Sequence, residues 1–259
     1  MSVSSSAVVA GYRQQLRVSL RRSGQVAVVL AAVPQALVFG WMLRHADSAD
    51  ALTRVAFGQV LLASWTASVL TLAWMLSQES WSGTLELGLS SPAALVLPMF
   101  GKGVALVVGG FVGGIVSTTV LLTAAGHLPR VDDVPLTALS FAAAAAIAVP
   151  ATAFVVAPLS ALSPGTRNFV NGLIPLGIVL GGFLFPVSAL PDWMEPIARL
   201  LPLSWMTDAL AGAATGRSVA HCLGHLAVGT AVAGVWALVA VRIFGAVERR
   251  FVEHGSLPQ

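Results

Sequence analysis

Long apolar blocks separated by short polar segments make up most of this chain. A membrane-spanning helix needs about 20 mostly apolar residues, and six blocks meet that requirement. They cover residues 24–43, 55–77, 93–124, 135–161, 168–187 and 221–245. The pattern predicts an all-α integral membrane protein with six transmembrane helices, in one domain that extends over residues 1–259.

Residues 1–23 have a different pattern, in which an apolar helix face lies beside a basic one. The apolar face carries Val8, Tyr12, Leu16 and Leu20, and the basic face carries Arg13, Arg17 and Arg21. This spacing predicts a helix that lies in the membrane interface, in contact with membrane lipids. A disordered basic tail is the alternative, which the regular spacing disfavours.

The distribution of basic residues predicts the orientation in the membrane. With the amino terminus in the cytoplasm, nine Lys and Arg residues fall on the cytoplasmic side and five on the outer side. Because cytoplasmic connections carry the excess of Lys and Arg, both chain termini are expected in the cytoplasm. We expect the protein in the inner (cytoplasmic) membrane of a bacterial cell.

Pairs of glycines recur inside two of the blocks. Gly109-Gly110 and Gly113-Gly114 lie in the third block, and Gly177 and Gly181 repeat the four-residue spacing in the fifth. Small residues at this spacing let helix backbones approach closely in lipid. We therefore predict tight helix packing at these positions.

The segment before the last block is apolar but is interrupted by prolines. Four prolines divide it into helices too short to cross a membrane: Pro186, Pro191, Pro196 and Pro202. We predict a re-entrant hairpin over residues 188–206 that dips into the outer leaflet, with a hairpin lying on the membrane surface as the alternative. Its candidate site residues are Pro191, Asp192, Trp193, Pro202 and Trp205.

Composition excludes several classes of protein. Apolar residues make up 56% of the chain, charged residues only 10%, and the mean hydropathy is +0.85, values that do not describe a soluble domain. The blocks contain almost no ionisable group apart from Lys102 and Arg242, which can reach the membrane surface, so an ion-driven carrier is disfavoured. The sequence has no basic cluster interleaved with aromatic residues, so it gives no indication of nucleic-acid binding.

The sequence also lacks the patterns of a catalytic site. We find no metal-ligand cluster, no activated nucleophile and no phosphate-binding loop. We therefore expect no enzyme activity and no cofactor on this chain. If it drives uphill transport, the energy has to come from another polypeptide.

A polar segment between the second and third blocks stands out against this apolar background. Residues 78–92 carry two of the eleven acidic residues of the chain, Glu79 and Glu86, and are predicted to face the cytoplasm. A helix this short and polar has no reason to lie in lipid. It suits a docking site for a soluble partner.

The same residues carry a family resemblance. Glu79, then Gly83-Thr84-Leu85-Glu86, closing on Ser91-Pro92, resembles the cytoplasmic signature of ABC-2-type transporter permeases. Leu190-Pro191-Asp192-Trp193 and Pro202 through Asp208-Ala209-Leu210 are similar to the outer hairpin of that family. The N-terminal basic helix resembles its elbow helix.

The resemblance implies a coupling helix over residues 78–92 that docks on an ABC ATP-binding subunit. The residues implied in docking are Glu79, Trp81, Gly83, Thr84, Leu85, Glu86 and Leu89. It also implies an assembly of two permease chains, as a homodimer or heterodimer, and two ATPase subunits that hold the ATP and Mg²⁺. The expected function is export of drugs, antibiotics or lipid-like molecules.

Two blocks contain candidate residues for the translocation pathway. Ser64, Ser68 and Thr71 form a polar stripe beside Trp65, and the fifth block begins with Asn168 and Asn171 and ends with Phe183 and Phe185. In related exporters these two helices border the central pathway. An uncharged stripe with aromatics suits amphipathic or hydrophobic cargo, and helix packing through hydroxyl groups is the alternative.

Two other functions remain open at this point. One is export of a cell-surface polysaccharide or lipid-linked glycan. The other is a structural or enzyme-anchoring membrane protein without transport activity.

Overall fold

The computed structural model describes residues 3–21, 24–44, 49–81, 96–127, 140, 142–145, 151–155, 172 and 175–254. Its elements are α1 (Val3–Arg21), α2 (Gly24–Leu43), α3 (Ala49–Trp81), α5 (Val96–Ala124), η2 (Val187–Ala189), α9 (Glu195–Arg199), α10 (Pro202–Ala214) and α11 (Val219–His254). Residues 142–145, 151–155 and 175–180 are also helical. No strand occurs in these described parts, which confirms the all-α class for them.

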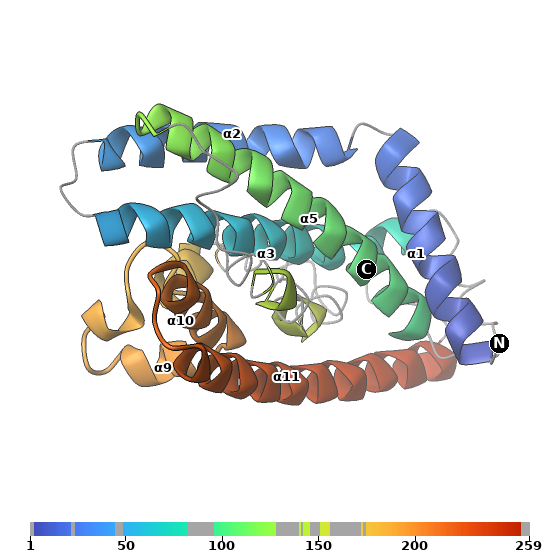
Figure 1. The fold of residues 1–259 in the computed structure, drawn as a ribbon. Coiled ribbons are helices and arrows are strands. Elements are labelled where there is room, and N and C mark those ends of the chain that lie inside the picture. Colours follow the sequence, from blue (N-terminus) through green and yellow to red (C-terminus); the bar gives the residue numbers. More distant parts are fainter. Residues whose placement is uncertain are drawn as a thin grey trace.

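α2, α3, α5 and α11 run along the molecule, α9 and α10 lie at one end, and α1 lies across the other end (Figure 1). α5 packs along α3 and also against α2, while α10 packs against α11 and α3. α1 packs on α5 at the end opposite α9 and α10. The arrangement therefore separates the N-terminal helix from the hairpin by the length of the bundle.

Two described helices are long and apolar enough to cross a membrane. They are Leu97–Ala124 and Val219–Ala246, each of 28 residues, with mean hydropathies of 2.1 and 2.0. Both expose rows of large apolar side chains, such as Val108 and Val112 on α5 and Val235 and Leu238 on α11. Such rows suit contact with lipid rather than water.

The ends of several helices differ from the expected spans. α2 matches residues 24–43, whereas α3 begins at Ala49 and ends at Trp81, beyond the expected 55–77 on both sides. The helix extends past the apolar block because its ends depend on backbone hydrogen bonds and capping, and not on the hydropathy of the side chains. The fifth block is helical only to residue 180, where Gly181 and Gly182 form a turn and Gly182 has a φ of 70°.

Glycines set the closest helix contacts, as their spacing predicted. A Cβ atom on Gly110 would lie 2.6 Å from Ser64 Cα, and one on Gly114 would lie 2.6 Å from Val60 Cα. Real Cβ atoms essentially never approach other atoms within 3.0 Å. The predicted close packing is therefore confirmed for the crossing of α5 over α3.

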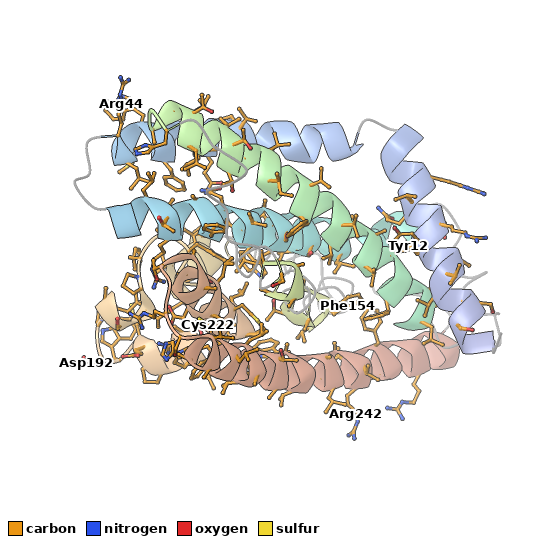
Figure 2. The ribbon with its side chains drawn as sticks, in the orientation of Figure 1. Tyr12, Arg44, Phe154, Asp192, Cys222 and Arg242 are labelled. Atoms are coloured by element: carbon orange, nitrogen blue, oxygen red, sulfur yellow. The ribbon has the colours of Figure 1, made fainter. Side chains whose placement is uncertain are left out.

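The expectation that Lys102 reaches the membrane surface is wrong. Lys102 is only 5% exposed, because α1 packs over this part of α5. Next to it, Gly101 lies directly against the backbone of Val8 and Tyr12. Arg242 does extend from the surface of α11 and points away from the other helices (Figure 2).

Candidate functional site

The predicted docking residues lie at the end of α3 and beyond it. Glu79 and Trp81 belong to the last turn of α3. Docking residues Gly83, Thr84, Leu85, Glu86 and Leu89 lie outside the described residues. Residues 78–81 thus continue α3 rather than opening a separate helix, so the docking segment (residues 78–92) is joined directly to this long helix.

Three candidate pathway residues on α3 are buried inside the chain: Ser64, Trp65 and Ser68. Trp65 packs on Gly177, and its Nε1–H donates a hydrogen bond of 3.2 Å to Thr152 Oγ1. The Ser68 hydroxyl donates to the carbonyl oxygen of Ser64 at 2.7 Å, and both serines are fully buried. The Ser68 bond lies within α3, whereas the Trp65 contacts and the approach of Gly110 to Ser64 are those of helix packing, the alternative interpretation of the stripe.

The other pathway candidates are only partly described. Phe183 is buried and lies against Gly58 of α3, while Phe185 is half-buried. Thr71 belongs to α3, and Asn168 and Asn171 lie outside the described residues. A pathway between two chains needs side chains at the surface of each chain, and Phe183 is buried within one. Its pathway role therefore stays a prediction, and it requires a conformation in which the fifth block separates from α3.

Prolines shape the hairpin as expected, because α9 and α10 each have one in the first turn. Pro196 lies in the first turn of α9 and Pro202 begins α10, positions where the missing N–H costs no helical hydrogen bond. Pro191 and Asp192 are exposed, with Asp192 at the outer edge of the molecule (Figure 2), and Trp193 is also exposed. The structure extends α10 to Ala214, eight residues past the expected end of the hairpin.

Trp205 fixes the corner between α9 and α10. Its Nε1–H donates to the carbonyl oxygen of Arg199 at 2.9 Å. The Arg199 guanidinium lies over its ring, 4.7 Å from the ring centre, in a cation–π contact. The aromatic ring therefore holds both the backbone and the charge of Arg199.

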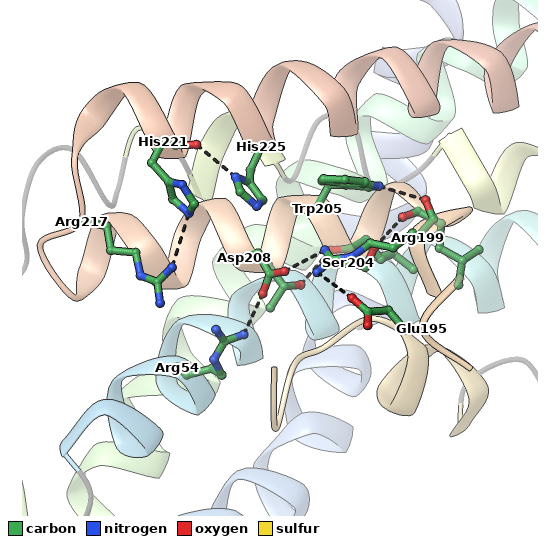
Figure 3. A network of polar contacts seen from close by, with 12 residues as sticks. Arg54, Glu195, Arg199, Ser204, Trp205, Asp208, Arg217, His221 and His225 are labelled. Atoms are coloured by element: carbon green, nitrogen blue, oxygen red, sulfur yellow. Dashed lines mark hydrogen bonds and ion pairs between the residues drawn. The ribbon is translucent and has the colours of Figure 1, made fainter. Parts of the chain in front are cut away.

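That charge belongs to an ion network made of Arg54, Glu195, Arg199 and Asp208 (Figure 3). Asp208 Oδ1 accepts from Arg54 Nη1 at 3.1 Å, and Asp208 Oδ2 accepts from Arg199 Nη1 at 2.8 Å. Glu195 Oε1 lies 3.7 Å from Arg199 Nη2. The network thereby joins α3, α10 and α9.

Partial burial strengthens the centre of this network. The side chain of Asp208 is 15% exposed and that of Arg54 is 19% exposed. Water competes weakly with ion pairs at such positions, and a hydrogen bond to a charged group contributes about 1.5–3 kcal/mol. The pair with Glu195 is longer and more exposed, so it contributes less.

Sequence reasoning missed Arg54 and Arg199 as site residues. Asp208 was part of the resemblance, and both arginines lie in or beside connections predicted on the outer side of the membrane. The presence of Asp208 and these two arginines on the same predicted side of the membrane is the signal that could have suggested ion pairs. Sequence alone could not choose the partners, because Arg54 and Asp208 are 154 residues apart.

The hairpin lies along α11 in an antiparallel register. Gly212 lies against Cys222 Sγ, Gly229 lies against Trp205, and Trp236 Nε1–H donates to the carbonyl oxygen of Leu200 at 2.9 Å. The 17 steps from Val219 to Trp236 correspond to about 26 Å along the helix. The hairpin and α10 therefore pack along the first half of α11, and the re-entrant position in the membrane stays a prediction.

Metal chemistry finds no support in the described part of the chain. None of its His, Cys, Asp and Glu side chains form a group of three or more that could hold a metal ion. His221 and His225 are neighbours on α11, with ring centres 4.3 Å apart, and Arg217 lies 3.4 Å from His221 Nε2. A cation beside the imidazole disfavours a divalent metal there.

Comparison with known proteins agrees with this architecture. Nodulation protein J of Rhizobium meliloti (strain 1021) is 26% identical over 205 residues, which cover 72% of this chain and 71% of that protein. Residues 7–214, from α1 through α10, match the family described as ABC-2 type transporter. The match includes the docking segment, the ion network and the hairpin, and the chain therefore belongs to the ABC-2 type transporter family.

Proposed function

We propose that this chain is the permease subunit of an ATP-driven exporter in the bacterial inner membrane. The observation that carries the proposal is the family match over residues 7–214. Membership makes the chain a membrane protein and implies association with an ABC ATP-binding subunit. In the proposed assembly two permease chains and two ATPase subunits act together, ATP and Mg²⁺ are bound by the ATPase subunits, and this chain is not itself an enzyme.

The docking segment is the proposed contact with the ATPase subunit. Its carboxylates, Glu79 and Glu86, would face the cytoplasm when both termini do, as the distribution of basic residues predicts. An exposed ion pair contributes less than about 1 kcal/mol. Trp81, Leu85 and Leu89 would therefore provide most of the affinity, because buried apolar anchors dominate such interfaces.

The hairpin supports an amphipathic or hydrophobic cargo. Trp193 and Leu200 are exposed there, in the same segment as the charged residues Glu195 and Arg199. A surface with apolar and charged groups side by side can receive both parts of an amphipathic molecule. Drugs, antibiotics and lipid-like molecules have this chemistry, so multidrug efflux and antibiotic resistance are the expected phenotypes.

Substitutions in the docking segment test this function. We expect Glu86→Gln and Gly83→Leu to lower export per ATP hydrolysed while the chain still inserts in the membrane. Glu253→Gln is the matched control, since it removes a carboxylate that lies on the predicted cytoplasmic side and outside the docking segment. The measurements are co-purification of the ATPase subunit, ATP hydrolysis and export; unchanged export in both docking variants would contradict the docking assignment.

A deletion strain tests the cargo class. Increased sensitivity to amphipathic drugs, with the drugs retained in the cell, is the expected result. Accumulation of a polysaccharide or lipid-linked glycan without altered drug sensitivity would favour the glycan alternative. Absence of any ATPase subunit from the purified complex would favour a membrane anchor without transport activity.

A further inference from the structure

α3 connects the two ends of the molecule that matter for transport. It is a single helix of 33 residues, about 50 Å long at 1.5 Å per residue. Glu79 lies in its last turn, at the docking segment, and Arg54 lies in its second turn, in the ion network. The 25 steps from Arg54 to Glu79 correspond to about 38 Å along the helix.

The packing of α3 favours movement as a rigid body. Its sequence contains no proline, the commonest cause of a sharp helix kink. Gly110 and Gly114 bring α5 into backbone contact with its middle, at Ser64 and Val60. A displacement applied at one end of such a helix reaches the other end with little bending.

At the hairpin end, charge connects α3 to α10. Asp208 uses one carboxylate oxygen for Arg54 of α3 and the other for Arg199 of α9. An ion pair restricts the relative position of two helices more than an apolar contact does, because burial of apolar surface is non-directional. A movement of Arg54 therefore acts on both short helices through a single side chain.

We propose that Arg54 and Asp208 transmit movements of α3 to the outer hairpin, which makes them positioning residues for export. The inference rests on the proposed function, in which the ATPase subunit moves the docking segment at the opposite end of α3. Nucleotide binding at the ATPase subunit shifts α3, Arg54 carries Asp208 with it, and α9 and α10 change position beside α11. When the pair is absent, ATP hydrolysis continues but the hairpin no longer follows.

A fluorophore on the hairpin reports this movement directly. Leu200 is 67% exposed at the junction of α9 and α10, and only its backbone carbonyl takes part in the bond with Trp236, so Leu200→Cys preserves that bond. Cys222→Ala removes the single native cysteine of the chain. The labelled chain, purified with its ATPase subunit and placed in lipid nanodiscs, is compared without nucleotide and with Mg-ATP and vanadate.

The expected result is a nucleotide-dependent change in fluorescence that Arg54→Gln reduces at least about fivefold, the lower end of typical coupling between sites. ATP hydrolysis by the complex continues, since the ATPase subunit is intact. Arg54→Lys keeps the charge and retains part of the change. Arg217→Gln, the matched control, removes an arginine near the hairpin that lies outside the network and leaves the change intact.

Three results would count against the inference, and they differ in what they overturn. An equal fluorescence change in Arg54→Gln and the parent would show that the Arg54–Asp208 pair only fixes the hairpin in place. Thermal unfolding would then show a lower stability of Arg54→Gln than of the parent, with no loss of transmission. A parent complex that hydrolyses ATP without any change at residue 200 would overturn the transmission itself. A chain that binds no ATPase subunit would overturn the proposed function and the inference together.

Discussion

Replacing Gly114 with alanine adds one methyl group where α5 crosses α3. The new Cβ would lie 2.6 Å from Val60 Cα and 2.9 Å from the Val60 carbonyl oxygen. Carbon atoms in contact are normally about 3.5–4.0 Å apart, so the helices must separate by about 1 Å. Both opposing atoms belong to the backbone, and no change of side-chain rotamer relieves the contact.

The cost follows from this overpacking. An extra methylene in a well-packed core destabilises a protein by about 1–3 kcal/mol. With about 2 kcal/mol as the central value, the melting temperature should fall by about 4–8 °C for a chain of this size. The intrinsic preference of helices for alanine over glycine offsets up to about 1 kcal/mol of the loss.

Thermal unfolding of the purified protein measures this effect, with Gly234→Ala as the control. Gly234 lies on α11 and has no atom within 4 Å of the position of a Cβ, so the same substitution should leave stability equal or slightly raised. Equal melting temperatures for Gly114→Ala and Gly234→Ala would refute the reasoning. They would mean that α3 and α5 do not approach as closely as their glycines allow.

Two further substitutions test other contacts. Trp65→Phe should cost more than about 1 kcal/mol in thermal unfolding, because it removes the hydrogen bond to Thr152 and leaves a gap beside Gly177. Trp65→Phe combined with Thr152→Val should cost less than the sum of the two single losses, and full additivity would argue against the bond. Gly11→Val should push α1 away from the backbone of Pro98 on α5 and speed trypsin cleavage at the arginines of α1. Gly245→Val, whose new side chain meets no neighbour, serves as the control. Equal cleavage rates in the two variants would show that the position of α1 does not depend on the contact at Gly11.

Local features of the sequence allowed much of the architecture to be predicted. The all-α class follows from the apolar blocks, since a lipid environment leaves helices as the simplest way to satisfy every backbone hydrogen bond within a segment. The broken hairpin followed from Pro196 and Pro202, which fix where α9 and α10 begin whatever their surroundings. The glycine pairs of the third block predicted close packing because they act through their own missing side chains.

The site was predicted less completely than the fold. The hydroxyl stripe on α3 had two interpretations, and the burial of Ser64 and Ser68 supports the packing interpretation in this conformation. Periodicity identifies a face of a helix but not the segment that covers it. For the same reason Lys102 was expected at the surface, although α1 covers it.

The sequence by itself determined the all-α class of the described parts and the places where prolines interrupt the hairpin, because these properties depend on residues within a few positions of each other; that residues 78–92 suit a soluble partner stays a prediction. Only the tertiary structure decided that Arg54 pairs with Asp208, that the hairpin reaches Trp236 of α11, and that Trp65 is buried. Each of these depends on the register between segments distant along the chain. That register is set by the packing of whole helices, in which many small contacts act together and no single residue pattern fixes the result.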